Sequence, residues 1–239
     1  MSAPSGAGVD ALAIAAVEEI RSGMTVGLGT GRAAARAIEA LAHRATAERL
    51  HLVCVATSLA SARMARGLGL HVSAMEGIER VDYLFDGADE VDPALRMLKG
   101  RGGAMTREKI VAQAADRRVY LVQAAKLVGR LGESAALPIE LLRFGLAAER
   151  RALVELGLES TLRRVGGERG AGTPFETDGG NPVVDAELPD GVDLAALAAA
   201  LDATPGVVGH GLFLDEADLV LVEDADGRVS RRVRSPARA

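Results

Sequence analysis

Apolar runs of strand length alternate with helical segments through the first half of the chain, and this rhythm limits the fold more than any other feature. Residues 9–21 and 34–45 repeat their apolar side chains with the period of a helix, whereas residues 24–28, 50–57 and 118–124 are short apolar runs. Strands that alternate with helices pair in parallel and carry helices on both faces of the sheet. The sequence therefore predicts an α/β fold built on a parallel sheet.

The rhythm changes at about residue 132. A polar helix, a strand-like segment and a long glycine-rich loop follow, before a helix and an apolar strand resume the earlier pattern. This change predicts a smaller inserted α+β domain over residues 132–209. Residues 1–131 and 210–239 then make up the domain that holds the parallel sheet.

Charge and aromatic content restrict the partners. The chain has 28 basic and 33 acidic residues, a formal charge of −5, three per cent aromatic residues and no Trp. Such a surface is poorly suited to follow nucleic-acid phosphates or to stack bases, although it allows one small anion pocket. The expected partner is a small molecule, with no nucleic acid and no membrane.

Local composition predicts the compartment and the two ends. The single cysteine, Cys54, lies in an apolar run and is predicted to be a buried strand residue without an internal disulfide, which fits the cytoplasm. Residues 1–20 lack a basic leader, and no apolar run approaches the roughly 20 residues that span a bilayer. Residues 228–239 are rich in arginine and serine without periodicity, which predicts a solvated, poorly ordered end.

Glycine-rich and polar segments follow four of the predicted strands. Functional groups of open parallel sheets gather at the carboxyl ends of strands, so these four exits form the candidate site. The first exit, Gly27–Arg32, is a glycine turn before a helix, where backbone amides suit an anion. It lacks the features of a P-loop and of a dinucleotide fingerprint, so it indicates either a phosphate site or a tight connection.

The second and third exits carry hydroxyls and acids. Ser58 begins a helix and is either a substrate ligand or a helix N-cap. The third exit places four acids together, Asp86, Asp89, Glu90 and Asp92. Their spacing is not that of an EF-hand, so no metal is predicted; the alternative is a solvated turn. Acids this close repel one another, which either raises the pKa of at least one of them or requires a nearby cation, and Lys99 is within reach.

The fourth exit, Lys99–Lys109, is a glycine-rich loop that leads into a helix. Glu108 falls in the first turn of this helix, where the N-terminus favours the ionised carboxylate that a general base needs. Near two lysines, Glu108 is predicted to be mostly ionised at neutral pH, from an ordinary pKa of about 4.3. Seen alone, it could equally serve only to balance the charge of the helix.

One order of motifs runs through residues 10–225: GLGTG, ATS, DGADEVD, KGRGGAMTREKIV, the lysine of AAKLVGRLG, LPIE, TDGGNPVVD and GHGLF. In order and spacing they closely resemble the ribose-5-phosphate isomerase type A family. The resemblance implies a Rossmann-like α/β domain with a smaller inserted α+β domain and a cleft between them. It also implies interconversion of ribose 5-phosphate and ribulose 5-phosphate in the pentose phosphate pathway, and a homodimer or homotetramer.

The resemblance further assigns roles to single residues. Glu108 is the base, Asp86 serves ring opening and hydroxyl proton traffic, and Asp89 and Lys99 bind the reacting end. The residues that hold the substrate are Gly29, Thr30, Gly31 and Lys126. The chemistry agrees, because one carboxylate can carry a proton from C2 to C1 through a cis-enediolate while a lysine stabilises the oxyanion. Neither a metal nor an organic cofactor is expected.

The chain departs from the family at its glycine turn. Arg32 and Ala33 stand where the family usually has Ser-Thr, and the usual lysine of the first helix is missing. Arginine can grip phosphate with two parallel hydrogen bonds, so Arg32 either contacts the substrate phosphate or pairs with a surface acid.

Two other functions remain open at this stage. A non-catalytic sugar-phosphate sensor would use the same fold without needing Glu108. An acyl or CoA transferase of related fold would use a glutamate as a nucleophile and form a thioester.

Overall fold

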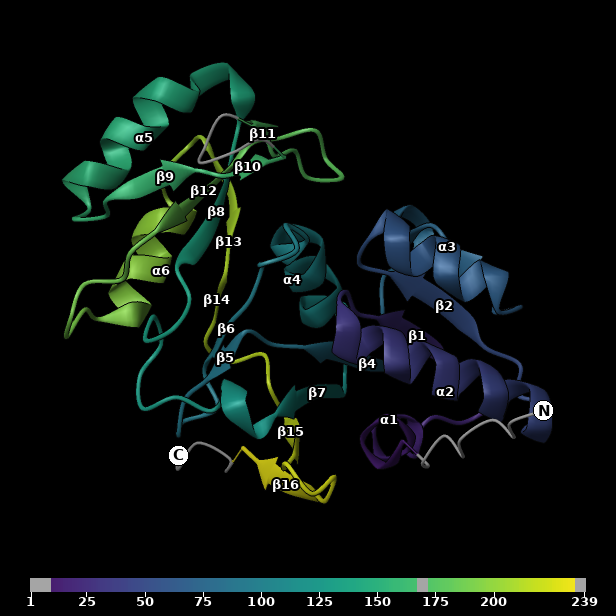
Figure 1. Ribbon diagram of the computed structural model, residues 1–239. Coiled ribbons are helices and arrows are strands. Elements are labelled where there is room, and N and C mark those ends of the chain that lie inside the picture. Colours follow the sequence, from purple (N-terminus) through teal and green to yellow (C-terminus); the bar gives the residue numbers. More distant parts are fainter. Residues whose placement is uncertain (1–9, 167–171, 235–239) are drawn as a thin grey trace, which may run out of the picture.

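The computed structural model describes residues 10–166 and 172–234 and is built around a seven-stranded sheet in the order β16-β15-β7-β4-β1-β2-β3 (Figure 1). Neighbouring strands run parallel except β15 and β16. The strands are β1 (Thr25–Leu28), β2 (Val53–Ala56), β3 (Val72–Ser73), β4 (Tyr83–Gly87), β7 (Arg118–Gln123), β15 (Leu219–Glu223) and β16 (Val229–Val233). The predicted α/β fold with a parallel sheet is confirmed.

Helices cover both faces of this sheet. Three of them, α1, α2 and α3, pack on one face, and α4 packs on the other. Their bounds are α1 (Ala11–Val17), α2 (Arg32–Glu48), α3 (Leu59–Gly67) and α4 (Met105–Ala114). Within the described ranges, no helix is both long and apolar enough to cross a membrane.

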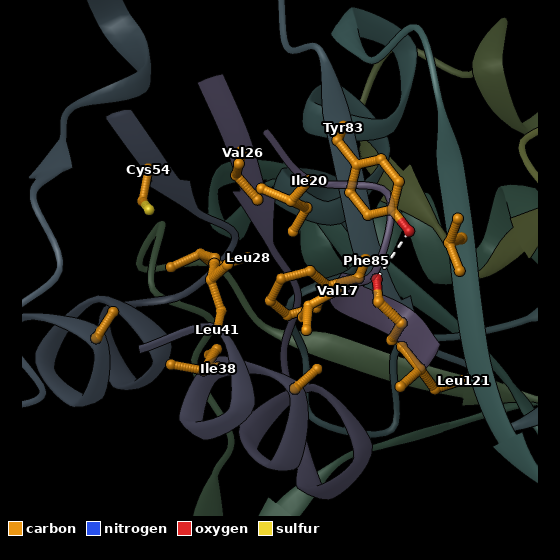
Figure 2. Packing of buried hydrophobic residues seen from close by; sticks show 14 of the residues in the cluster. Val17, Ile20, Val26, Leu28, Ile38, Leu41, Cys54, Tyr83, Phe85 and Leu121 are labelled. Carbon is orange, nitrogen blue, oxygen red and sulfur yellow. Dashed lines mark hydrogen bonds between the residues drawn. The ribbon is translucent and has the colours of Figure 1, made fainter. Parts of the chain in front are cut away.

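Alternate strand residues separate the core into two layers, because successive side chains of a strand point to opposite faces. Cys54 belongs to the layer under α1–α3, whereas its neighbour Val55 belongs to the layer under α4. Figure 2 shows the first layer, in which the Tyr83 hydroxyl donates to the Ala16 carbonyl of α1 at 2.7 Å. Cys54 is fully buried, as predicted, and burial raises the pKa of its thiol.

Three smaller antiparallel sheets complete the described part, in the orders β13-β8-β12-β9, β14-β6-β5 and β10-β11. The four-stranded sheet packs against α5 and α6 around a third core and stands apart from α1–α3 in Figure 1. Its elements are β8 (Leu137–Leu141), α5 (Leu146–Glu155), β9 (Ser160–Leu162), β12 (Val183–Ala186), α6 (Leu194–Asp202) and β13 (Val207–His210). The other strands are β5 (Glu90–Val91), β6 (Met97–Leu98), β10 (Arg164–Val165), β11 (Thr173–Pro174) and β14 (Leu212–Phe213), and the short 3-10 helices are η1 (Met75–Gly77), η2 (Ala124–Lys126) and η3 (Arg143–Gly145).

The C-terminal segment corrects one prediction. Residues 229–233 are not a poorly ordered end but the edge strand β16, which pairs with β15 from Leu219↔Val233 to Glu223↔Val229. The pairing depends on backbone hydrogen bonds, which the irregular side-chain pattern does not reveal. The Arg234 guanidinium then donates to the carbonyls of Leu95, Leu214 and Ala217. Residues 235–239 lie outside the described residues.

Candidate active site

The chain reverses its direction of travel across the sheet between β1 and β4. It first moves from β1 to β2 and β3 on one side, and then returns to β4, β7 and β15 on the other. The crevice at the carboxyl ends of strands beside such a reversal is the usual ligand site of open parallel sheets. A cavity of about 620 Å³ lies there, and its walls include Thr30, Gly31, Arg32, Asp89, Lys99, Glu108 and Lys126. The structure thus brings together predicted residues from three of the strand exits, together with Lys126.

Gly29 and Asp86 are not among the residues that line the cavity. A Cβ atom on Gly29 would lie 2.1 Å from Asp86 Oδ1 and 2.6 Å from Asp86 Cα. Only glycine therefore allows the exit of β1 to come this close to β4. As a result, Asp86 Oδ1 accepts hydrogen bonds from the backbone amides of Thr30 at 3.0 Å and Gly87 at 2.7 Å.

Lys99 lies between two acids at the base of the cavity. Its Nζ is 2.9 Å from Asp86 Oδ2 and 3.2 Å from Glu108 Oε2, and it also donates to the Gly87 carbonyl. The rings of Tyr120 and Phe213 lie 5.4 and 5.5 Å from the ammonium, a separation at which aromatic faces attract cations.

All three charged groups of this cluster are buried. Burial by itself would lower the pKa of Lys99, but the charges of Asp86 and Glu108 outweigh it and hold the pKa above its ordinary value. The ammonium is therefore a fixed positive charge at neutral pH.

Glu108 is the fourth residue of α4 and reaches into the cavity. Its Oε2 lies within ion-pair distance of Lys99 Nζ, but the geometry makes no hydrogen bond. Within the described part of the chain, this buried oxygen has no hydrogen-bond partner. Glu108 therefore presents an oxygen that is free to accept a proton, which is what a general base requires.

The ionisation of Glu108 differs from the sequence-based expectation. Burial raises the pKa of its carboxyl to about 8, and the charge of Asp86 acts in the same direction. Lys99 opposes both effects without cancelling them. The pKa of Glu108 is therefore higher than that of a free glutamate, because the helix N-terminus and Lys99 do not compensate the lost hydration. A pKa near the working pH suits a group that must both take and return a proton.

The second strand exit serves the scaffold more than the cavity. Ser58 Oγ accepts from the Ser61 amide at 3.1 Å and caps the N-terminus of α3, so the N-cap interpretation holds. Ser58 does not line the cavity, and we do not retain it as a substrate ligand. Its neighbour Thr57, which sequence reasoning did not select, holds Thr30 through a hydroxyl contact of 2.7 Å.

Two arginines stand one turn apart at the start of α2. Arg32 lines the cavity with an exposed side chain, and in the described residues no acid lies within ion-pair distance of it. Arg36 also lines the cavity and was missed in the sequence, although its i+4 spacing from Arg32 was an available signal. It donates two hydrogen bonds each to Asp10 and Glu223, at 2.6 to 2.9 Å. These hydrogen bonds lower the pKa of Asp10.

The remaining acids of DGADEVD have separate structural partners. Asp89 Oδ2 accepts from the Arg101 amide at 2.9 Å at the edge of the cavity. Glu90 is buried and accepts from the amides of residues 132, 134 and 135, and Asp92 pairs with Arg96 at 2.6 Å. Of the four acids, Asp86 and Asp89 therefore belong to the site, Glu90 anchors the loop over residues 132–135, and Asp92 forms a local ion pair.

Comparison with known proteins gives one consistent result. The family model for ribose 5-phosphate isomerase A (phosphoriboisomerase A) matches residues 53–227. Ribose-5-phosphate isomerase A of Roseiflexus sp. (strain RS-1) is 46% identical over 215 residues, which cover 90% of this chain and 91% of the relative. The protein of the same name from Dinoroseobacter shibae is 41% identical over 224 residues, covering 91% and 84%.

Solved structures agree with the sequence matches. Ribose 5-phosphate isomerase A from Methanocaldococcus jannaschii superposes with a TM-score of 0.85 at 36% identity, covering 93% of this chain and 96% of its own. A D-ribose-5-phosphate isomerase in complex with phospho-erythronic acid gives a TM-score of 0.87 at 32% identity, covering 94% and 97%. The likeness therefore extends over both the seven-stranded sheet and the four-stranded sheet.

Proposed function

The chain belongs to the ribose-5-phosphate isomerase A family and interconverts ribose 5-phosphate and ribulose 5-phosphate, and we propose that Glu108 moves the proton between C2 and C1. One observation carries this proposal: the buried Oε2 of Glu108 has no hydrogen-bond partner in the described residues, and Lys99 Nζ lies 3.2 Å away. A base with a free oxygen beside a fixed cation is the arrangement that enediolate chemistry requires.

The reaction proceeds from the open-chain sugar with its aldehyde at C1. Glu108 takes the proton from C2, the C1–C2 double bond forms, and the carbonyl electrons move onto O1 to give the cis-enediolate. Lys99 stabilises this negative charge. The protonated Glu108 then returns its proton to C1 while the ketone forms at C2, and the hydroxyl proton of O2 ends on O1.

The two aspartates take different parts in the proposal. Asp86 Oδ2 is held by Lys99 and Oδ1 by two amides, which supports a role in positioning Lys99 rather than in contacting the sugar during ring opening. Asp89 and Lys126 lie on the cavity wall, so we assign them to the substrate.

A coupled assay for ribulose 5-phosphate tests the function directly. The purified chain should convert ribose 5-phosphate at the same rate before and after extensive dialysis against EDTA, because the proposed steps use only side chains of the protein. The acids nearest the cavity already have protein donors, as described above for Asp86 and Asp89. No turnover would contradict the function, and activity that is lost in EDTA and restored by a divalent ion would contradict the metal-free mechanism.

We assign the substrate phosphate to the glycine turn and Arg32. Thr30, Gly31 and Arg32 line the same end of the cavity, and the Arg32 guanidinium has no acidic partner in the described residues. A phosphate contact is made equally in the ground state and the transition state.

Arg32→Ala is therefore expected to raise KM about tenfold and to change kcat less than about twofold. The double variant Arg32→Ser with Ala33→Thr should recover much of the loss, because it restores two hydroxyl donors. Steady-state kinetics measure both constants. Arg63→Ala on α3 is the control, since it removes an exposed arginine away from the cavity. An unchanged KM in Arg32→Ala would show that other groups hold the phosphate.

The division into domains and the assembly are further proposals. Residues 132–209 contain nearly all of the four-stranded sheet with its two helices and its own core, which supports the inserted domain. A homodimer or homotetramer is supported by exposed apolar side chains at one end of that sheet: Phe144 on η3 is 97% exposed, and Leu142 just before η3 and Val208 on β13 are also exposed. The molar mass in solution distinguishes these assemblies from a monomer. The buried thiol of Cys54 is compatible with the proposed cytoplasmic location.

A further inference from the structure

Glu140, in the LPIE motif of β8, is a buried carboxylate that the proposed reaction does not use. The residue is 4% exposed. Three neutral donors satisfy it: Thr106 Oγ1 at 2.5 Å, Thr177 Oγ1 at 2.8 Å and Asn181 Nδ2 at 3.0 Å. A buried carboxylate is costly unless it is hydrogen-bonded in this way, so the cluster indicates a selected arrangement rather than an incidental contact.

The partners of Glu140 join two parts of the molecule. Thr106 is the second residue of α4, whereas Thr177 and Asn181 belong to the TDGGN loop before β12. The adjacent Asp178 accepts from the Leu59 amide of α3 at 2.7 Å and lies 3.5 Å from Arg107 of α4. The loop and β8 therefore contact the starts of α3 and α4, and α4 carries Glu108.

The bond from Thr106 to Glu140 is a side-chain hydrogen bond at the start of α4. Its N-cap residue, Ala104, supplies no side-chain hydrogen bond to the helix. A Cβ atom on Gly209 would lie 2.4 Å from Thr106 Oγ1, so β13 also packs tightly against the same residue. Thr106 and Glu108 are two positions apart and thus about 200° apart around the helix. Glu140 accordingly accepts a hydrogen bond on one side of the first turn of α4, while Glu108 faces the cavity on the other side.

We infer that Glu140 is a positioning residue for the isomerisation: through Thr106 it fixes the first turn of α4 and thereby places the Glu108 carboxylate beside Lys99 and the substrate. This inference rests on the proposed role of Glu108. A displacement of a reacting group by about 1 Å can lower a rate by about a hundredfold, so a hydrogen bond on the far side of the helix can control turnover.

Thr106→Val and Thr106→Ser form a matched pair. Valine has the shape of threonine without the hydroxyl, and serine keeps the hydroxyl. We expect Thr106→Val to lower kcat about tenfold or more with KM within about twofold, and Thr106→Ser to retain most of the activity. Thr46→Val is the control, because among the described residues the Thr46 hydroxyl bonds only to the Ala42 carbonyl of its own helix.

The pH dependence separates positioning from a loss of folding. Lys99 lowers the pKa of Glu108, whereas Asp86 and Asp89 raise it. If the first turn of α4 moves Glu108 away from Lys99 in Thr106→Val, the pKa of Glu108 rises. The acid limb of the pH profile, where kcat/KM falls as Glu108 becomes protonated, then shifts to higher pH. A variant that is merely less stable would show a lower melting temperature with the limb in place.

Glu140→Gln should lower kcat and shift the limb in the same direction, because glutamine lacks the negative charge that strengthens the hydrogen bond from Thr106. Combining it with Thr106→Val should add little, because valine already removes that hydrogen bond. If Glu140→Gln does not fold, the Thr106 pair decides alone. A wild-type kcat in Thr106→Val would overturn the inference. So would a fall in kcat that is matched by an equal rise in KM, with no shift in the pH profile of kcat/KM. If Glu108→Gln is inactive while Thr106→Val is normal, this inference alone fails; if Glu108→Gln is active, the proposed mechanism itself fails.

Discussion

Glu108→Gln is expected to lower kcat at least about a hundredfold while ribose 5-phosphate still binds. Glutamine keeps the size of the side chain and can still donate to and accept from its neighbours, but it cannot take the C2 proton. Lys99 and the cavity wall remain in place, so the ground-state contacts of the substrate are largely unchanged. The coupled assay measures kcat, and calorimetric titration measures binding.

The control for this variant is Glu39→Gln, an exposed position on α2 that removes the same charge outside the cavity. In the wild-type enzyme, kcat/KM should rise as the pH increases through about 8, because burial raises the pKa of Glu108 and only the ionised form is a base. Activity of Glu108→Gln within tenfold of wild type would remove Glu108 from the mechanism.

The position of the site could be predicted, since it depends on where strands end. The glycine turn after β1 and the acids after β4 follow apolar runs in the sequence, and the parallel pairing of β1 with β4 brings these two exits to one edge. The lysine loop instead follows β6 of the antiparallel sheet β14-β6-β5, which the alternation of strands and helices does not predict. The requirement for a cation beside clustered acids also pointed to Lys99, which the structure places between Asp86 and Glu108.

Properties that depend on three-dimensional surroundings could not be predicted in the same way. The direction of the Glu108 pKa shift follows from burial by segments far apart in sequence, and no local pattern gives the extent of that burial. Ser58 suits a cap and a ligand equally well, and only the location of the cavity decides between them. Glu140 reads as an ordinary strand residue until the fold brings Thr106 and the TDGGN loop against it.

Removing Lys99 should have an effect at least as large as removing the base. Lys99→Ala takes away the charge that would stabilise the enediolate, and it leaves Asp86 and Glu108 as two buried acids without their shared cation. Loss of one preorganised donor to an oxyanion costs about a hundredfold to a thousandfold in kcat, and we expect a loss of at least that size.

The same variant makes a second prediction, about pH. Without Lys99, burial and the charge of Asp86 both raise the pKa of Glu108 with nothing as close to oppose them, so the acid limb of kcat/KM should move to higher pH. Ethylammonium added to Lys99→Ala should restore part of kcat, because a small cation can occupy the space that the lysine leaves.

Lys109 provides the matched control for Lys99→Ala. It is the residue after Glu108 and its ammonium also lies against the Phe213 ring, at 4.9 Å, but it bonds to the Leu212 carbonyl and does not line the cavity. Lys109→Ala should lower the melting temperature and leave kcat within about threefold of wild type, since it removes packing without removing the charge at the reacting end. Retained turnover in Lys99→Ala, or a loss of the same size in Lys109→Ala, would show that the ammonium of Lys99 does not act on the enediolate.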